Sequence, residues 1–142
     1  MLEKYGVEAA VSADPLCALK AADVSLVKSG TITLEAALMP APMIIIYKLS
    51  SLSYSIMKFF AKIPFIGLPN IVAGRKIVPE LIQEKASARE MAAETIRLLK
   101  NKRACDEMIS NLREVKRRLG KRGASKRAAK AAVSFLEARR RA

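Results

Sequence analysis

The sequence predicts an α/β fold in which a parallel sheet with βαβ connectivity is followed by C-terminal helices. Two apolar runs, Val24 to Val27 and Met43 to Tyr47, have the length of buried strands and are too short for helices. A helix-length segment separates them, and strands joined in this way pair in parallel. From Ser87 onward the apolar residues recur with helical spacing.

The segment between the two apolar runs predicts a helix from Ile32 to Met39. Pro40 and Pro42 end this helix, because proline has no N–H to donate and restricts the residue before it.

Upstream of the βαβ unit, we expect a short strand from Val7 to Val11. Asp14 then acts as the N-cap of a helix that has Pro15 in its first position and runs to Ala22.

The turn Ser29-Gly30-Thr31 follows the first strand and is the first candidate ligand site. In open parallel sheets, ligands bind outside the carboxyl ends of the strands, and the N–H groups and dipole of a helix N-terminus attract phosphate. Gly30 permits close approach, and Glu35 on the same helix face can accept a hydrogen bond from a sugar hydroxyl. The spacing alone leaves an alternative open, in which Thr31 caps the helix and Glu35 complements its dipole.

A second candidate site lies further along the chain. A short strand from Phe65 to Leu68 is expected to lead into a loop that presents Asn70, whose amide can donate and accept. The guanidinium of Arg75 fits a diphosphate with two parallel hydrogen bonds. The alternatives are a turn residue for Asn70 and a solvated charge near a helix start for Arg75. A helix is expected to begin or bend at Pro79-Glu80 and to end near Lys85.

The segments SGTxTLE, PMIIIYK and GLPNIVAGRKIVPELIQE together resemble the C-terminal part of lipid-A-disaccharide synthases, bacterial glycosyltransferases of the GT-B type. The resemblance implies that the βαβ unit is half of a GT-B nucleotide-binding domain. It implies transfer of diacylglucosamine from UDP-diacylglucosamine to lipid X, which gives lipid A disaccharide 1-phosphate and UDP, without a cofactor. It also implies a set of donor-binding residues: Ser29, Gly30, Thr31, Glu35, Tyr47, Asn70 and Arg75.

The family's N-terminal acceptor domain, which is expected to supply the general base, has no counterpart in these 142 residues. We therefore expect a truncated C-terminal fragment that is inactive alone, and its catalytic residue is left unassigned. Residues 1–85 are predicted to form a partial UDP-sugar binding domain, and residues 86–142 a basic helical segment.

The most apolar stretch, Leu49 to Pro69, does not have the pattern of a transmembrane helix. Lys58 and Lys62 interrupt it, and Pro64 stops it short of the roughly 20 residues that a span needs. A helix from Ser51 either packs in the core or lies on an anionic membrane. The resemblance favours the membrane, at the inner face of the cytoplasmic membrane. The expected membrane-facing residues are Leu52, Ile56, Lys58, Phe59, Phe60 and Lys62.

Positive charge is concentrated at the C-terminus. Residues 100–142 hold 15 Lys or Arg and 4 Asp or Glu, which gives +11 of the total net charge of +13. Such a tail suits a solvated helix face, a nucleic acid or an anionic membrane. Phe135 is its single aromatic residue, so base stacking is not favoured. The alternative to the enzyme is a basic helical nucleic-acid-binding or adaptor protein without enzymatic activity.

Two further helices carry most of this tail. Ser87 and Glu90 form a capping box that predicts a helix to Leu99, and Gly120 and Gly123 separate the two helices that follow. The middle helix has an apolar stripe formed by Ala104, Met108, Leu112, Val115 and Leu119. The last helix has a second stripe formed by Ala128, Ala132, Phe135 and Leu136. We expect a homodimer that buries Met108, Leu112, Val115 and Leu119 between chains; the rival is a last helix that folds back over the stripe.

Cys17 and Cys105 match no metal-ligand, redox or disulfide spacing, so both are expected to be buried in a protein of the reducing cytosol. The sequence has no histidine, and no metal site is predicted.

Overall fold

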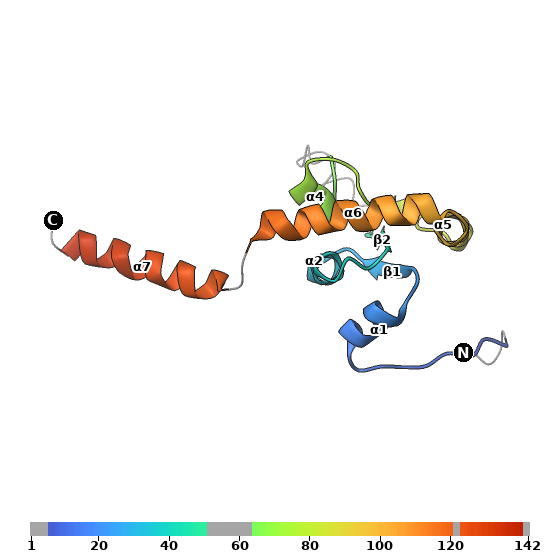
Figure 1. Cartoon of the computed structure of the whole chain (residues 1–142), viewed down its shortest axis with the longest axis horizontal. Coiled ribbons are helices and arrows are strands. Elements are labelled where there is room, and N and C mark those ends of the chain that lie inside the picture. Colours follow the sequence, from blue (N-terminus) through green and yellow to red (C-terminus); the bar gives the residue numbers. More distant parts are fainter. Residues whose placement is uncertain (1–5, 51–63, 121–122, 141–142) are drawn as a thin grey trace.

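The computed structural model describes residues 6–50, 64–120 and 123–140 (Figure 1). The N-terminal elements are α1 (Pro15–Ala21), β1 (Ser25–Lys28), α2 (Thr31–Leu38), β2 (Met43–Tyr47), α4 (Leu68–Ala73), β3 (Glu80–Ile82) and a 3-10 turn η2 (Gln83–Lys85). The C-terminal elements are α5 (Ala88–Lys100), α6 (Lys102–Leu119) and α7 (Ala124–Arg140). The fold class is confirmed: a parallel-sheet α/β unit followed by helices.

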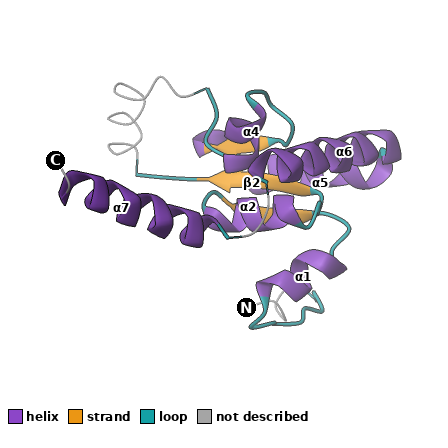
Figure 2. Cartoon of the chain, turned by 60° about the vertical axis from the view of Figure 1, so that its left-hand side comes forward, coloured by secondary structure: helices purple, strands orange, loops and turns teal. Residues whose placement is uncertain are grey.

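The sheet has the strand order β1-β2-β3, and both strand pairs are parallel (Figure 2). Val27 lies opposite Ile45, and Ile46 lies opposite Leu81. The helix expected from Pro79-Glu80 is wrong, because β3 and the turn η2 occupy that segment. Pairing with β2 decides the outcome: Ile45 N donates to Pro79 O at 2.9 Å, and Leu81 becomes buried.

Two strands expected from the sequence are also absent from the described residues. Residues 7–11 form no strand and are exposed, since no described strand lies beside them to pair with their backbone. The strand expected from Phe65 to Leu68 does not form, because Leu68 begins α4 and Pro69 follows in its first turn, where a missing N–H costs nothing.

Helix α1 begins as predicted. Leu16 N and Cys17 N donate to Asp14 Oδ1 at 2.8 and 3.3 Å, so Asp14 is the N-cap. The expected burial of Cys17 is wrong, because Leu19 is the residue that α1 buries. The Cys17 thiol instead donates to Asp14 Oδ2 at 3.1 Å, and this hydrogen bond to a carboxylate raises the pKa of the thiol. Cys105 is half-buried.

Helices α2, α4 and α6 pack against one another, and α5 contacts both β2 and α6 (Figures 1 and 2). The core combines both halves of the chain: the largest fully buried apolar side chains include Met43, Ile44, Ile45, Val78, Leu98, Leu112 and Val115. Met43 N, at the start of β2, donates to Met108 Sδ at 3.4 Å. Helix α6 is therefore part of the fold.

The apolar stripe of α6 is buried within a single chain, so the dimer interface expected there is wrong. Met108, Leu112 and Val115 are all buried, and Ala104 and Leu119 pack against the same core. Helices α2, α4 and α5 supply the covering surface, which the sequence spacing did not reveal.

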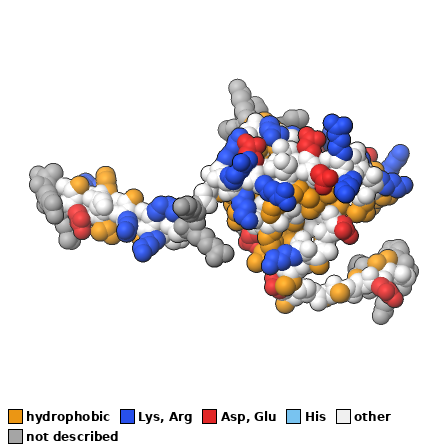
Figure 3. Space-filling view, in the orientation of Figure 1, with side chains coloured by type: hydrophobic (Ala, Val, Ile, Leu, Met, Phe, Trp, Pro, Cys, Tyr) orange, Lys and Arg blue, Asp and Glu red, His pale blue; other side chains and the backbone are white. Residues whose placement is uncertain are grey.

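Helix α7 extends away from the rest of the protein, so it does not fold back over α6 (Figure 1). Gly120 ends α6 with φ of 75°, which confirms the predicted break. Val133, Phe135 and Leu136 of α7 are more than half exposed. Figure 3 shows Lys and Arg side chains spread over the surface near α6 and along α7.

Within the described ranges, no helix is both long and apolar enough to cross a membrane. Those same ranges contain no cluster of three or more His, Cys, Asp or Glu that is arranged to hold a metal ion. The predicted membrane-facing residues, which fall in 51–63, lie outside the described residues.

Candidate functional site

The Ser29-Gly30-Thr31 turn lies where it was predicted, between the carboxyl end of β1 and the start of α2. Ser29 N donates to Ile46 O of β2 at 2.9 Å. Ser29 Oγ donates to Ile66 O, just before α4, at 3.4 Å. Ser29 is thus tied to both segments that border the turn.

Gly30 leaves the N-terminus of α2 open. It is the N-cap residue, with φ of 154° and ψ of −168°, a conformation that is essentially restricted to glycine. A Cβ at this position would meet no atom within 4 Å. The α2 N-terminus has no side-chain cap. Thr33 N is already bonded to Gly30 O, so the N–H groups of Thr31 and Ile32 are the ones left for an anion.

The alternative in which Thr31 caps α2 is wrong. Thr31 is exposed and its side chain makes no capping bond. Instead, the buried Thr33 donates from Oγ1 to Gly30 O at 2.6 Å, which holds the turn from inside. Glu35 lies one turn after Thr31 and is exposed. Both side chains are therefore accessible to a ligand.

Tyr47 ends β2, opposite Ile82 of β3, and is half-buried. It borders a mainly apolar pocket of about 270 Å³ at the carboxyl edge of the sheet, lined by Lys28, Ile46, Tyr47, Lys48, Ala86 and Met91. The two lysines were not predicted from the sequence. Their positions directly at the ends of β1 and β2 were the signal that could have found them.

Asn70 lies in α4 and not in a loop, and it is fully buried. Its Oδ1 accepts from Ile77 N and Val78 N at 2.7 and 3.0 Å. Its Nδ2 donates to Val78 O at 3.0 Å and to Glu80 Oε1 at 2.7 Å. Both donors and both acceptor positions of the amide are thus used inside the protein.

Glu80, whose role was not predicted from the sequence either, binds the chain directly before α4. Its carboxylate accepts from Ile66 N at 3.0 Å and from Gly67 N at 2.9 Å. The signal was a helix whose N-cap, Gly67, has no side chain to accept a bond. Because a carboxylate already compensates this helix end, the end is not available to phosphate.

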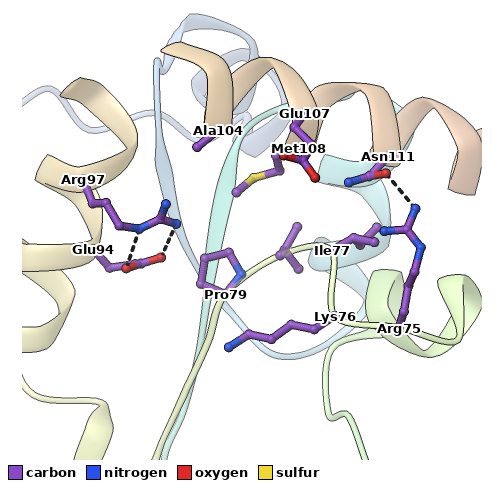
Figure 4. Close-up of a pocket in the computed structure, with 11 residues that line it drawn as sticks. Arg75, Lys76, Ile77, Pro79, Glu94, Arg97, Ala104, Glu107, Met108 and Asn111 are labelled. Carbon is purple, nitrogen blue, oxygen red and sulfur yellow. Dashed lines mark hydrogen bonds and ion pairs between the residues drawn. The ribbon is translucent and has the colours of Figure 1, made fainter. Parts of the chain in front are cut away.

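Arg75 lies at the other edge of the sheet. It follows Gly74, the left-handed C-cap of α4, so its expected place near a helix start is wrong. Its Nη2 donates to Asn111 Oδ1 of α6 at 2.8 Å (Figure 4). The same Nη2 lies 3.5 Å from Glu114 Oε2. The contact between Arg75 and Asn111 could not be predicted from the sequence, because only the packing of α6 brings the two residues together.

Figure 4 shows the pocket that Arg75 borders, formed by the residues before β3 together with α5 and α6. Its volume is about 280 Å³, and its lining includes Met108, which contacts the first residue of β2. The pocket therefore lies at the amino ends of the strands. The structure does not bring Arg75 together with the Ser29-Gly30-Thr31 turn.

Helix α6 also binds the C-terminus of α4. Arg118 Nη1 donates to Val72 O and Ala73 O at 3.2 and 3.1 Å. Glu114 pairs with both Arg118 and Arg75. The hydrogen bond from Arg118, aided by both positive charges, lowers the pKa of Glu114.

The chain is similar to proteins of one family along most of its length. The family profile described as lipid-A-disaccharide synthetase matches residues 7–135. A lipid-A-disaccharide synthase of Anaeromyxobacter dehalogenans (strain 2CP-C) is 50% identical over 116 residues, which are 82% of this chain and 30% of the relative. The enzyme of Dechloromonas aromatica is 44% identical over 84% of this chain and 31% of its own length. That of Geobacter sulfurreducens is 40% identical over 96% of this chain and 36% of its own length. The chain thus spans about a third of the length of these relatives.

Proposed function

Because the chain belongs to the lipid-A-disaccharide synthase family, we propose that it carries the donor-binding part of a glycosyltransferase of lipid A biosynthesis. The donor is UDP-diacylglucosamine and the acceptor is lipid X. An acceptor hydroxyl oxygen bonds to the anomeric carbon of the donor sugar, and the bond from that carbon to the UDP oxygen breaks. The electron pair leaves with UDP, and the hydroxyl proton passes to a general base. The products are lipid A disaccharide 1-phosphate and UDP.

The open N-terminus of α2 is the observation that carries this proposal. As the glycosidic bond breaks, negative charge grows on the diphosphate of UDP, and N–H groups already oriented toward it stabilise that charge. Gly30 allows the phosphate to approach the backbone, since no side chain occupies that space. At α4, by contrast, the Glu80 carboxylate already occupies the N-terminus.

The accessible side chains around this turn have complementary roles. We assign the backbone of the turn and the exposed Thr31 hydroxyl to the diphosphate, and the exposed Glu35 carboxylate to the ribose hydroxyls. The Ser29 hydroxyl holds the turn through its bond to Ile66 O. Tyr47 borders the adjoining pocket, where Lys28 and Lys48 add positive charge. These assignments use one edge of the sheet, as expected for a ligand of a parallel sheet.

Asn70 and Arg75 have supporting roles in this proposal. The Asn70 amide is saturated by bonds inside the protein, so we propose that it shapes the donor site without contacting UDP. Arg75 joins the end of α4 to α6 at the opposite edge. We propose that it stabilises the position of α4 and does not bind the diphosphate.

We also propose that the protein binds peripherally to the inner face of the cytoplasmic membrane. The support is the charge of residues 100–142, +11 of the total +13, and the Lys and Arg side chains exposed along α7 (Figure 3). Flotation with liposomes is expected to increase with anionic lipid and to decrease with salt, because salt screens exposed charges. Flotation that is indifferent to both would refute this placement.

The donor site is tested by titrating the full chain with UDP in a calorimeter. Replacing Glu35 with Gln removes a charged acceptor from an exposed position, so the fold is retained while the dissociation constant for UDP rises about tenfold. Glu137→Gln on α7 makes the same chemical change far from the turn and is the matched control. Equal affinities for Glu35→Gln and wild type would contradict the ribose assignment. A wild-type chain that does not bind UDP would contradict the proposed function.

A further inference from the structure

The chain leaves the sheet after β2 and returns to it just before α4. We call Leu49 the outgoing foot and Ile66-Gly67 the returning foot of this excursion. Side chains of one short segment, Glu80 to Gln83, hold both feet. Gln83 lies 34 positions from Leu49, and Glu80 lies 13 positions from Gly67.

Gln83 holds the outgoing foot. Its Oε1 accepts from Leu49 N at 2.6 Å, and its Nε2 donates to Leu49 O at 3.2 Å. The last backbone pair between β2 and β3 joins Tyr47 to Ile82. The side-chain amide of the next residue thus replaces a peptide group and continues the pairing past the end of the strands.

The backbone of Gln83 is unusual in a way that serves this contact. Gln83 has φ of 53°, which is rare for a residue other than glycine, and it is 5% exposed. A buried glutamine in this conformation persists only where surrounding contacts over-determine it, and such positions are concentrated at functional sites. The conformation turns the amide back toward β2, where both of its polar ends find partners on Leu49.

Glu80 holds the returning foot from the first residue of β3, through its bonds from Ile66 N and Gly67 N. Gly67 is needed at this point, because a Cβ there would press on the Ile45 side chain and lie 2.9 Å from Glu80 Oε1. The returning foot therefore lies directly against the sheet.

Ser29, the first residue of the proposed donor site, is bonded to the returning foot and to the strand that leads to the outgoing foot. Ser29 N binds Ile46 O on the strand that leads to the outgoing foot, and Ser29 Oγ binds Ile66 O on the returning foot. We propose that Gln83 and Glu80 are positioning residues, which fix the two feet of the segments bonded to Ser29 and so set the shape of the donor site. We call the hydrogen bonds from Gln83 and Glu80 to the two feet the clamp. The clamp rests on these hydrogen bonds alone, whereas the identity of the ligand rests on the proposed function.

The clamp is tested by amide hydrogen exchange at Leu49, measured by NMR on the full chain without ligand. Gln83→Met keeps a similar volume and removes both hydrogen bonds, so Leu49 is expected to exchange about tenfold faster. Lys85→Met introduces the same side chain at an exposed position of the same turn and is the matched control. Leu112 in α6 reports global opening and is expected to keep its protection. An unchanged Leu49 rate in Gln83→Met overturns the clamp.

The link to the donor site is tested with the same variants and UDP. Gln83→Met is expected to weaken UDP binding about tenfold, with Lys85→Met unchanged. A merely structural role would lower the melting temperature and leave the affinity of the folded protein at the wild-type value. Faster exchange at Leu49 with unchanged UDP affinity would therefore overturn the positioning role. A wild-type chain that fails to bind UDP counts against the proposed function, while the ligand-free exchange still decides whether Gln83 holds Leu49.

Discussion

The amide of Asn70 donates to the carboxylate of Glu80 across 2.7 Å, and this contact joins α4 to β3. Each partner also binds backbone groups: Asn70 accepts from the segment before β3, and Glu80 accepts from the two residues directly before α4. Among the described residues, no buried side-chain N or O atom is left without a partner. Removing either member of the pair therefore leaves buried polar groups unsatisfied.

Replacing Asn70 with Leu is expected to lower the free energy of unfolding by about 3 kcal/mol, because two buried N–H groups lose their acceptor. Equilibrium unfolding in urea measures the effect. Asn111→Ala is the control, since it removes a partly exposed bond to Arg75 and should cost less than about 1 kcal/mol. Equal losses in the two variants would show that the Asn70 network contributes little to stability.

The ion pair between Glu94 and Arg97 predicts a loss of stability in acid. The hydrogen bond from Arg97 lowers the pKa of Glu94 below its ordinary value of 4.5. A carboxyl whose pKa is lower in the folded state stabilises the fold above its unfolded pKa, and this stabilisation disappears as the pH falls through the folded pKa. Melting temperatures measured from about pH 6 to pH 3 should fall less steeply for Glu94→Gln than for wild type. Parallel curves would contradict this assignment.

A charge introduced on the apolar face of α6 is expected to destabilise the protein, whereas a charge on the apolar face of α7 is not. Leu112 is 0% exposed, so Leu112→Glu buries a carboxylate and is expected to unfold the chain, at a cost of about 4 kcal/mol or more. Phe135 is 67% exposed, and Phe135→Glu should leave the melting temperature unchanged. Circular dichroism compares the two. If Leu112→Glu stayed folded and lost only its self-association, the result would support a dimer interface at Leu112 and contradict its burial within one chain.

The sequence predicted the elements that have strong local signals. Apolar runs and terminating prolines located β1, α2 and β2 to within a residue or two, and Asp14 and Ser87 marked two helix starts as N-caps. The turn at Gly30 was placed correctly for the same reason, since it lies between two such elements.

Features that depend on distant residues were not predictable. Strand β3 has 3 residues, too few to show a period, and exists because β2 lies beside it. The roles of Asn70 and Arg75 depend on partners 10 and 36 positions away. Without the packed structure, a polar side chain near a turn resembles a ligand contact even when it serves the protein's own backbone.

Helix α4 has 6 residues, and both of its ends are held by side chains that come later in the chain. Glu80 binds the N–H groups of Ile66 and of the N-cap Gly67, directly before the helix, and Arg118 binds its last carbonyls. A helix this short is not stable alone in water, where about 12 residues or more are needed. During synthesis, α4 therefore remains unformed until residue 118 has emerged from the ribosome and α6 has docked. It is expected to be among the last elements to order, and a growing chain that stops at α5 exposes the surface of α2 that α4 covers.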